Sequence, residues 1–342
     1  MWTRLLFLAI FSTLLPVAFA QDADKPACDR ACLENYINRY LTAMLAHEPD
    51  PELFARDVKF TENGVRLPLG NEGLWFSMSA KGNYKFYVPD VETQQVAFIG
   101  TVREAAAAPR AAIAANTAGA QPAAGNLVAI ALRLKIVNEL ITEAEQLVLR
   151  PEVNLFGGGA TTPPRFPPAG EAVDKLGAPH QIYSEVIPAT ERPSREELIK
   201  AANYYFAGLQ RNDGKGYYPF TDDCLRLENG MQTAGPPAAD TAAGPTRMMG
   251  CKEQFETGLK NVVTGIRDRR FVAVDRERGI VFAFGFFDHR PINWTWQIAE
   301  LFKIEKGQIR RIEAVFLRCP YGLNSGWSTY EQGMSEEIQI IK

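Results

Sequence analysis

Residues 301–318 of the chain read LFKIEKGQIRRIEAVFLR and repeat an earlier stretch, residues 133–150, which reads RLKIVNELITEAEQLVLR. The two stretches align without a gap. The residues that coincide are Lys303 with Lys135, Ile304 with Ile136, Ile309 with Ile141, Glu313 with Glu145, Leu317 with Leu149 and Arg318 with Arg150. A repeat of this kind indicates that the chain contains two copies of one structural unit.

The repeat extends toward the N-terminus of each half. FTENGVRL at 60–67 and RLENGMQT at 226–233 share a Glu-Asn-Gly triplet, and a helical pattern precedes each, at 31–47 and at 194–210. The second helix begins with a capping box, in which Ser194 and Glu197 satisfy backbone donors reciprocally. The triplet occurs in both copies, and Asn-Gly favours the positive φ angles of a tight turn, so we interpret it as structural.

Strand patterns follow each triplet. In the second half, 271–275 and 280–289 predict one hairpin, and 294–318 predicts another that turns at Lys306 and Gly307. The first half has comparable segments at 94–105 and 126–150. The order of one long helix followed by a run of strands predicts an α+β fold in each half.

Length and composition fit two globular domains. The chain has 342 residues, of which 46% are hydrophobic, and its net charge is −3. This charge gives no electrostatic footprint for nucleic acid. The three histidines are scattered, so the sequence predicts no metal site, and no motif indicates a cofactor.

The N-terminal residues 1–20 have the pattern of a signal peptide, with one Arg, an apolar run and a final Ala-Phe-Ala. We therefore expect a protein exported to the periplasm or beyond, with no membrane attachment after cleavage; a membrane anchor is the alternative. Export permits disulfides. Local pairing would join Cys28 with Cys32 and Cys224 with Cys251, although spacing alone leaves other arrangements open.

The chain resembles the SnoaL-like branch of the nuclear-transport-factor-2-like superfamily, in tandem, and a SnoaL-related exported family with no assigned function. The similarity lies in SREELIKAANYYFAGLQRNDG (194–214), GIRDRRFVAVDRERGIVFAFGFFDHR (265–290) and CPYGLNSGW (319–327). It implies two cone-shaped barrels, each a long helix packed in a curved antiparallel sheet. The expected divisions are a first barrel at 28–150, a Gly/Pro-rich linker at 151–192, a second barrel at 193–330 and a tail at 331–342.

Polar residues on an apolar background distinguish the second copy. Alternation places Glu300 on one face of its strand with Trp and Phe residues, whereas the aligned residue in the first copy is Leu132. Burial would raise the pKa of Glu300 and make it usable as a general acid or base. The alternative is a structural ion pair with an arginine such as Arg318 or Arg267.

Two further groups complete the predicted catalytic set. His289 ends a strand and could relay a proton, although a lone His there is often a turn residue. Tyr205 could donate to an oxyanion, and the neighbouring tyrosines include packing residues. Residues predicted to bind substrate are Tyr204, Phe282, Phe284, Trp294, Trp296, Phe302 and Arg318.

The leading hypothesis is an exported, cofactor-independent lyase or isomerase that uses general acid-base chemistry on a small apolar molecule, aromatic or polyketide-like. A module that binds such a ligand without reaction is the first alternative. A dimerisation platform, with a homodimer as partner, is the second. Fold resemblance does not separate these hypotheses, so the site must.

Overall fold

The computed structural model describes residues 27–105, 125–151, 168–211, 213–236, 248–257 and 263–339. The predicted signal peptide and most of the alanine-rich stretch at 105–125 lie outside these residues. Within them, no helix is long and apolar enough to span a bilayer. The predicted disulfides Cys28–Cys32 and Cys224–Cys251 are both formed, and Cys319 is buried and unpaired.

The first half forms one sheet with a long helix on one face. Its elements are α1 (Arg30–Ala46), β1 (Phe54–Glu62), β2 (Val65–Arg66), α2 (Leu74–Ser77), β3 (Met78–Asp90), β4 (Gln95–Glu104), β5 (Asn126–Val137) and β6 (Leu140–Leu149). The strand order is β2-β1-β6-β5-β4-β3.

The second half repeats this arrangement. Its elements are α5 (Arg195–Arg211), β7 (Phe220–Glu228), β8 (Met231–Ala234), α6 (Cys251–Thr257), β9 (Gly265–Asp275), β10 (Ile280–His289), η3 (Arg290–Ile292), β11 (Trp294–Glu305), β12 (Gln308–Pro320), α7 (Tyr330–Gly333) and β13 (Ile338–Gln339). The strand order is β13-β9-β10-β11-β12-β7-β8. The molecule is therefore an α+β protein with two similar sheets.

The expectation of purely antiparallel sheets is wrong. The strand after each long helix pairs in parallel with the second strand of the long hairpin of its own copy, β1 with β6 and β7 with β12. β13 also runs parallel to β9. Alternation within a strand indicates which faces are buried, but it does not show whether the strand runs parallel or antiparallel to its neighbour. The mixed topology was therefore not visible in the sequence.

Local signals set the element boundaries. The capping box is confirmed, because the Glu197 amide donates to the Ser194 hydroxyl and the Ser194 amide donates to the Glu197 carboxylate. The structural reading of the triplet is also confirmed. Asn63 and Asn229 have φ of 51°, and each side chain bonds the backbone of its copy's last strand, at Val148 and Phe316 respectively.

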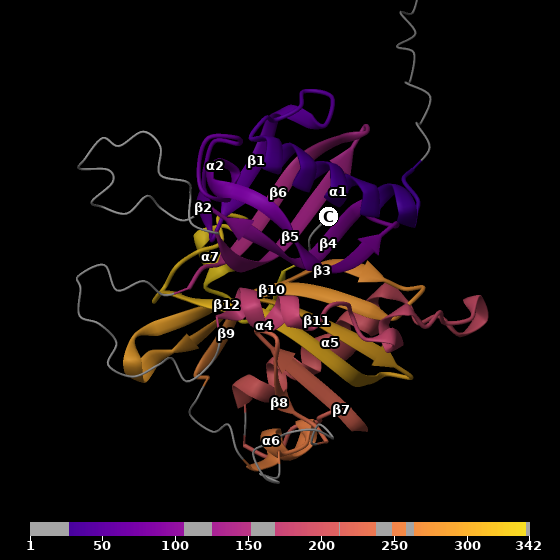
Figure 1. Cartoon of the computed structure of the whole chain (residues 1–342). Coiled ribbons are helices and arrows are strands. Elements are labelled where there is room, and N and C mark those ends of the chain that lie inside the picture. The colour runs from indigo at the N-terminus through magenta and orange to yellow at the C-terminus, as the bar shows by residue number, and fades with distance from the viewer. Residues whose placement is uncertain are drawn as a thin grey trace, which may run out of the picture.

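The two sheets pack against each other. One face of each sheet is covered by its own long helix, and we call this the helix face. The opposite faces form a joint apolar core, which we call the shared face; it combines residues of β3 to β6 with residues of β9 to β12. Figure 1 shows the first half stacked on the second, with α4 (Ala169–Lys175) where the halves meet.

Polar ties cross this junction in reciprocal pairs. Arg30 is the first residue of α1 and binds Asp275 at the end of β9 (2.7 Å), and Arg195 is the first residue of α5 and binds Asp90 at the end of β3 (2.5 Å). Each half therefore reaches the same structural position of the other, as in a two-fold symmetric dimer.

The described part of the predicted linker is folded. It contains α4, η1 (Gln181–Ser184) and η2 (Ala189–Glu191). Val173 is buried in the shared core, and Asp174 accepts hydrogen bonds from the backbone and side chain of Asn83. The segment therefore adds to the junction between the halves. The predicted tail is folded as well, because β13 extends the second sheet.

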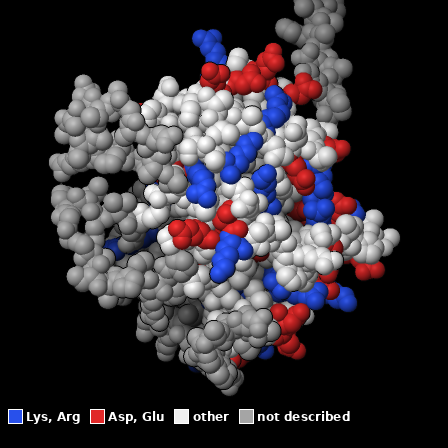
Figure 2. Space-filling model, in the orientation of Figure 1, with Lys and Arg blue, Asp and Glu red and all other residues white. Residues whose placement is uncertain are grey.

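On the face shown in Figure 2, Lys and Arg side chains are interspersed with Asp and Glu side chains over the described residues. Ion pairs at the surface of the described residues include Arg276 with Glu92 and Arg310 with Glu305. Exposed pairs of this kind contribute little to stability, so the buried ties described above matter more for the junction.

Candidate active site

Glu300 lies in the middle of the second sheet, on its helix face. On β11 it stands between Ile298 and Phe302, which both pack in the core beneath α5. Its lateral neighbours are two alanines, Ala283 on β10 and Ala314 on β12. The Glu300 residue has 0% exposure. A carboxyl group has therefore been placed among apolar side chains, as the alternation predicted.

The Glu300 carboxyl is poorly compensated. Burial raises its pKa well above the ordinary value, the charge of Glu228 raises it further, and Arg226 and Tyr205 act in the opposite direction. The Tyr205 hydroxyl faces the carboxyl, but too loosely to count as a formed hydrogen bond, and within the described residues both carboxyl oxygens lack a proper partner. A buried group in this state is costly and is a candidate for function.

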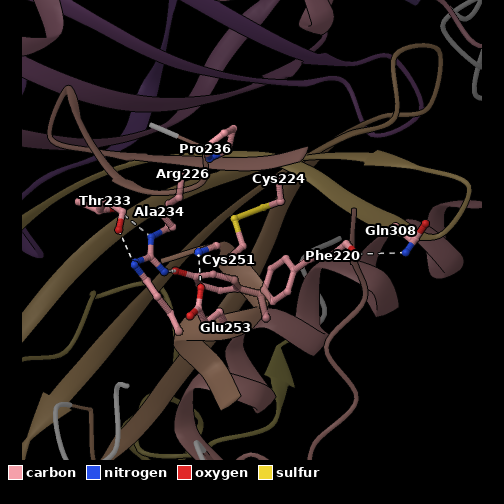
Figure 3. The surroundings of a disulfide bond; sticks show 12 residues. Phe220, Cys224, Arg226, Thr233, Ala234, Pro236, Cys251, Glu253 and Gln308 are labelled. Carbon is pink, nitrogen blue, oxygen red and sulfur yellow. Dashed lines mark hydrogen bonds between the residues drawn. A yellow bond between two sulfur atoms is a disulfide. The ribbon is translucent and has the colours of Figure 1, made fainter. Parts of the chain in front are cut away.

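Arg226 organises the polar groups beside Glu300. This β7 guanidinium donates to the Tyr205 hydroxyl (3.2 Å), to the Thr233 hydroxyl (2.9 Å) and to the side-chain carbonyl of Gln254 (2.5 Å). Glu228 pairs with it at 3.3 Å. The result is a hydrogen-bonded cluster around the Arg226 guanidinium at the Tyr205 end of the site, and Figure 3 shows Arg226 with Thr233 in this cluster.

A disulfide holds the cover of this cluster in place. Cys224 on β7 is bonded to Cys251, the first residue of α6 (Figure 3). The same short helix contributes Gln254 to Arg226 and packs Phe255 on Tyr205, with ring centres 5.2 Å apart. Helix α6 is thus held over the site by one disulfide, a hydrogen bond to Arg226 and an aromatic contact with Tyr205.

Sequence reasoning missed Arg226, Thr233 and Gln254. A signal for Arg226 was present, because Cys224, Arg226 and Glu228 alternate along β7 and must share one face. Thr233 and Gln254 had no such signal, since their approach to Arg226 depends on the disulfide and on the path of the chain between β8 and α6.

The first copy has a closed polar network at the same place. Tyr40 and Tyr205 occupy the same position in their helices of 17 residues. Tyr40 donates to Gln146 (3.0 Å) and accepts from the Trp75 indole (2.9 Å), and Gln146 donates to Glu62 (3.1 Å). None of these four side chains has a buried polar atom without a partner. The first copy thus also has buried polar groups on this face, and these groups satisfy one another.

His289 does not lie beside Glu300. It pairs with Trp294, six positions along β11 from Glu300, which corresponds to about 20 Å at ~3.3 Å per residue. His289 instead packs edge-on against Trp296, with ring centres 4.2 Å apart. The two groups predicted for acid-base chemistry are therefore not brought together, because Glu300 lies in the middle of β11 whereas His289 lies at the end of the neighbouring strand β10.

The predicted substrate-binding residues divide into four places. Phe302 is on the helix face next to Glu300, but Phe282 and Phe284 belong to the shared core against the first half. The strand that carries these two residues, β10, is apolar on both faces. Alternation along the sequence therefore could not show which of its faces the helix covers. Tyr204 is half-buried and packs on the exposed Tyr217, away from Glu300.

Trp294, Trp296 and Arg318 line a cleft at the end of the second sheet. Its volume is about 530 Å³, and the first half contributes Asn63 and Arg150 to its wall. Trp296 lies four positions from Glu300 on β11, roughly 13 Å away. No group of His, Cys, Asp and Glu in the described residues could hold a metal ion.

Comparisons with known proteins concern mainly the second half. Residues 191–316 match a family described as "Domain of unknown function (DUF8021)". This range includes Tyr205, Arg226 and Glu300. No curated protein matches the chain.

Similar solved structures include a de novo designed protein with a curved β-sheet, 16% identical, with a TM-score of 0.26, covering 36% of this chain and 87% of the designed one. AclR of Streptomyces galilaeus is 14% identical, with a TM-score of 0.25, covering 35% of this chain and 80% of AclR. Scores of this size carry no argument about this chain.

Proposed function

We propose that the second half is a small-molecule enzyme of the lyase or isomerase type, in which Glu300 transfers a proton without a cofactor. The single observation behind this proposal is the Glu300 carboxyl, fully buried and without a properly formed hydrogen bond. The first copy has Leu132 at the aligned position, so the fold does not require an acid there. The substrate class proposed is small, apolar and aromatic or polyketide-like, because Phe206, Phe255 and Phe302 pack around Tyr205 beside Glu300.

The proposed chemistry uses three groups. Glu300, as the carboxylate, removes a proton from a carbon next to a carbonyl. The Tyr205 hydroxyl, polarised by Arg226 at 3.2 Å, donates to the enolate oxygen that forms. Return of the proton to a different carbon gives an isomer, and departure of a leaving group with its bonding electrons gives an elimination product.

Entry to Glu300 requires movement of its cover. Glu300 and Tyr205 have almost no exposed surface, so a substrate must displace side chains on the helix face. We assign this movement to α6, which has seven residues and one disulfide. Loops and short helices that cover a site commonly move on binding.

We further propose that the two halves are SnoaL-like barrels of the nuclear-transport-factor-2-like superfamily and that the protein is exported. The helix on one face of each sheet supports the first proposal. Two disulfides and the Ala-Phe-Ala pattern at residues 18–20 support the second.

The test is conversion of a panel of aromatic dimers, phenolic acids, steroids and polyketides, followed by mass spectrometry and chromatography. We expect Glu300→Gln to abolish product formation. Glu300→Leu, which copies Leu132, should do the same while raising the free energy of unfolding by roughly 2 kcal/mol at neutral pH, because an uncompensated buried group is removed. A loss of activity with a gain in stability separates catalysis from misfolding.

The matched control is Glu313→Gln. Glu313 is also a buried carboxyl of the second sheet, but its hydroxyl partner is Tyr84 of the first half. It should leave turnover unchanged. Full activity of both Glu300 variants would refute the proposal, and ligands recovered unchanged by the native protein would favour the alternative, a binding module, for which the 530 Å³ cleft is the supporting observation.

A further inference from the structure

The cleft at the end of the second sheet contains equivalent residues from both copies, with different neighbours. Arg150 and Arg318 end the two aligned stretches, and both line the cleft. In the first copy Arg150 is neutralised by two carboxylates, Glu62 at 2.8 Å and Glu104 at 2.9 Å. This side of the cleft therefore has no uncompensated cation.

In the second copy, the residues at the positions of Glu62 and Glu104 do not neutralise Arg318. The counterpart of Glu62 is Glu228, in the second Glu-Asn-Gly triplet, and Glu228 pairs with Arg226 instead. The counterpart of Glu104 is His289. Glu104 pairs across the sheet with the first residue of β5, and His289 pairs with the first residue of β11. Arg318 makes no ion pair with any residue in the described part of the chain.

Aromatic residues have replaced small ones around Arg318. The residues aligned with Asn126, Val128 and Val148 of the first copy are Trp294, Trp296 and Phe316. Their rings form a continuous wall. The ring centres of Trp294 and Trp296 are 6.4 Å apart and their planes make an angle of 35°. The ring centres of Trp296 and Phe316 are 4.8 Å apart and their planes make an angle of 34°.

Arg318 is held over this wall. Its guanidinium carbon lies 4.2 Å from the centre of the Trp294 ring, a cation–π geometry that fixes the charge while leaving its donors available. The Trp294 indole nitrogen is buried and has no partner among the described residues. The cleft thus combines an uncompensated cation with a flat aromatic surface.

We propose that this cleft binds a planar aromatic carboxylate. The carboxylate pairs with the Arg318 guanidinium, which suits bidentate recognition, and the ring packs on Trp294 and Trp296. Since Trp296 lies roughly 13 Å from Glu300 along β11, the cleft is a binding site separate from the proposed catalytic residue. Binding itself does not depend on turnover and is tested without it.

The experiment is calorimetric titration of the full chain with 2-naphthoate and with its neutral analogue 2-naphthamide. We expect 2-naphthoate to bind at least roughly tenfold more tightly, the effect of one hydrogen-bonded charge. Arg318→Gln should remove this preference and leave 2-naphthamide binding intact. His289→Glu, which introduces the residue found at Glu104 in the first copy, should also remove the preference for 2-naphthoate. The new carboxylate would pair with Arg318, as Glu104 pairs with Arg150.

Arg310→Gln is the control. Arg310 lies on the same strand but is already paired with Glu305 and Asp223, so its variant should bind both probes as the native protein does. Equal affinities for the two probes, no binding of either, or an unchanged preference in Arg318→Gln would overturn the proposal. Glu300→Gln should still bind 2-naphthoate, so failure of the catalytic proposal is distinguishable from failure of this one.

Discussion

The glutamate shared by the two aligned stretches joins the halves of the molecule. Glu145 receives two hydrogen bonds from Arg270 on β9, each 2.7 Å long. Glu313, its counterpart, accepts from the Tyr84 hydroxyl on β3 at 2.5 Å. Both carboxyls are buried at the shared face, and Glu145 forms an ion pair with Arg270, whereas Glu313 has no ion pair among the described residues.

Glu313 makes stability depend on pH. Burial raises the pKa of Glu313 to about 7, although the hydrogen bond from Tyr84 opposes the shift. Because the folded-state pKa exceeds the unfolded value, this group stabilises the fold below the unfolded pKa, and the contribution is lost as the pH rises through about 7. We expect a loss of roughly 3 kcal/mol between about pH 4 and pH 8.

The measurement is chemical denaturation of the native protein and Glu313→Gln across this range. The difference between the two isolates Glu313, because the titration of Glu300 is common to both proteins and cancels. Parallel pH profiles would contradict the prediction.

The short helices that cover the two long helices differ in their attachment. In the first half, Trp75 of α2 is buried and bonded to Tyr40. In the second half, α6 presents Phe255 to Tyr205 and is tied to β7 by the disulfide between Cys224 and Cys251. The cover of the first site is thus part of a closed network. The cover of the second is held by the disulfide, by hydrogen bonds of Gln254 and by the packing of Phe255.

Removal of the tether should destabilise the second half. The disulfide closes a loop with a sequence separation of 27, for which the lost chain entropy corresponds to about 3 kcal/mol. We expect the Cys224→Ser, Cys251→Ser double variant to lose about this much free energy of unfolding. The Cys28–Cys32 bond spans a separation of only 4, so the corresponding double variant should lose less, and equal losses would contradict a loop-entropy origin.

The sequence predicted most elements but fewer of the contacts between them. The helix periods and turn residues located α1, α5 and the two hairpins of the second half correctly. β3 was not predicted, since its 13 residues include Gly82 and several charged side chains with little alternation. The position of Glu300 followed from alternation, whereas its distance from His289 and the roles of Phe282 and Phe284 depended on strand register and on which face the partner sheet covers.

At the scale of the whole molecule, each half completes the core of the other. Phe282, Phe284 and Val272 are buried against Tyr84 and Phe86 of the first half. Without the first half, Arg270 would lose its partner Glu145. The loss of one partner of a buried ion pair costs about 3–5 kcal/mol of folding free energy.

Separate expression of the halves tests this dependence. We expect residues 27–151 and residues 168–342 each to be unstable or aggregated alone and to form a folded complex when produced together, with a single cooperative unfolding transition. Arg30→Ala and Arg195→Ala, which remove the reciprocal ties to Asp275 and Asp90, should weaken that complex. A monomeric second half as stable as the full chain would contradict the expectation.

The reciprocal ties also bear on how the two copies can change over time. When a symmetric dimer is made of identical chains, every substitution enters both subunits at once, so a buried acid that destabilises one core destabilises both. A tandem chain removes this constraint, because each copy is encoded separately. Leu132 can preserve a well-packed core in the first copy while Glu300 occupies the aligned position in the second, so one half supplies the stability that the other half's acid reduces.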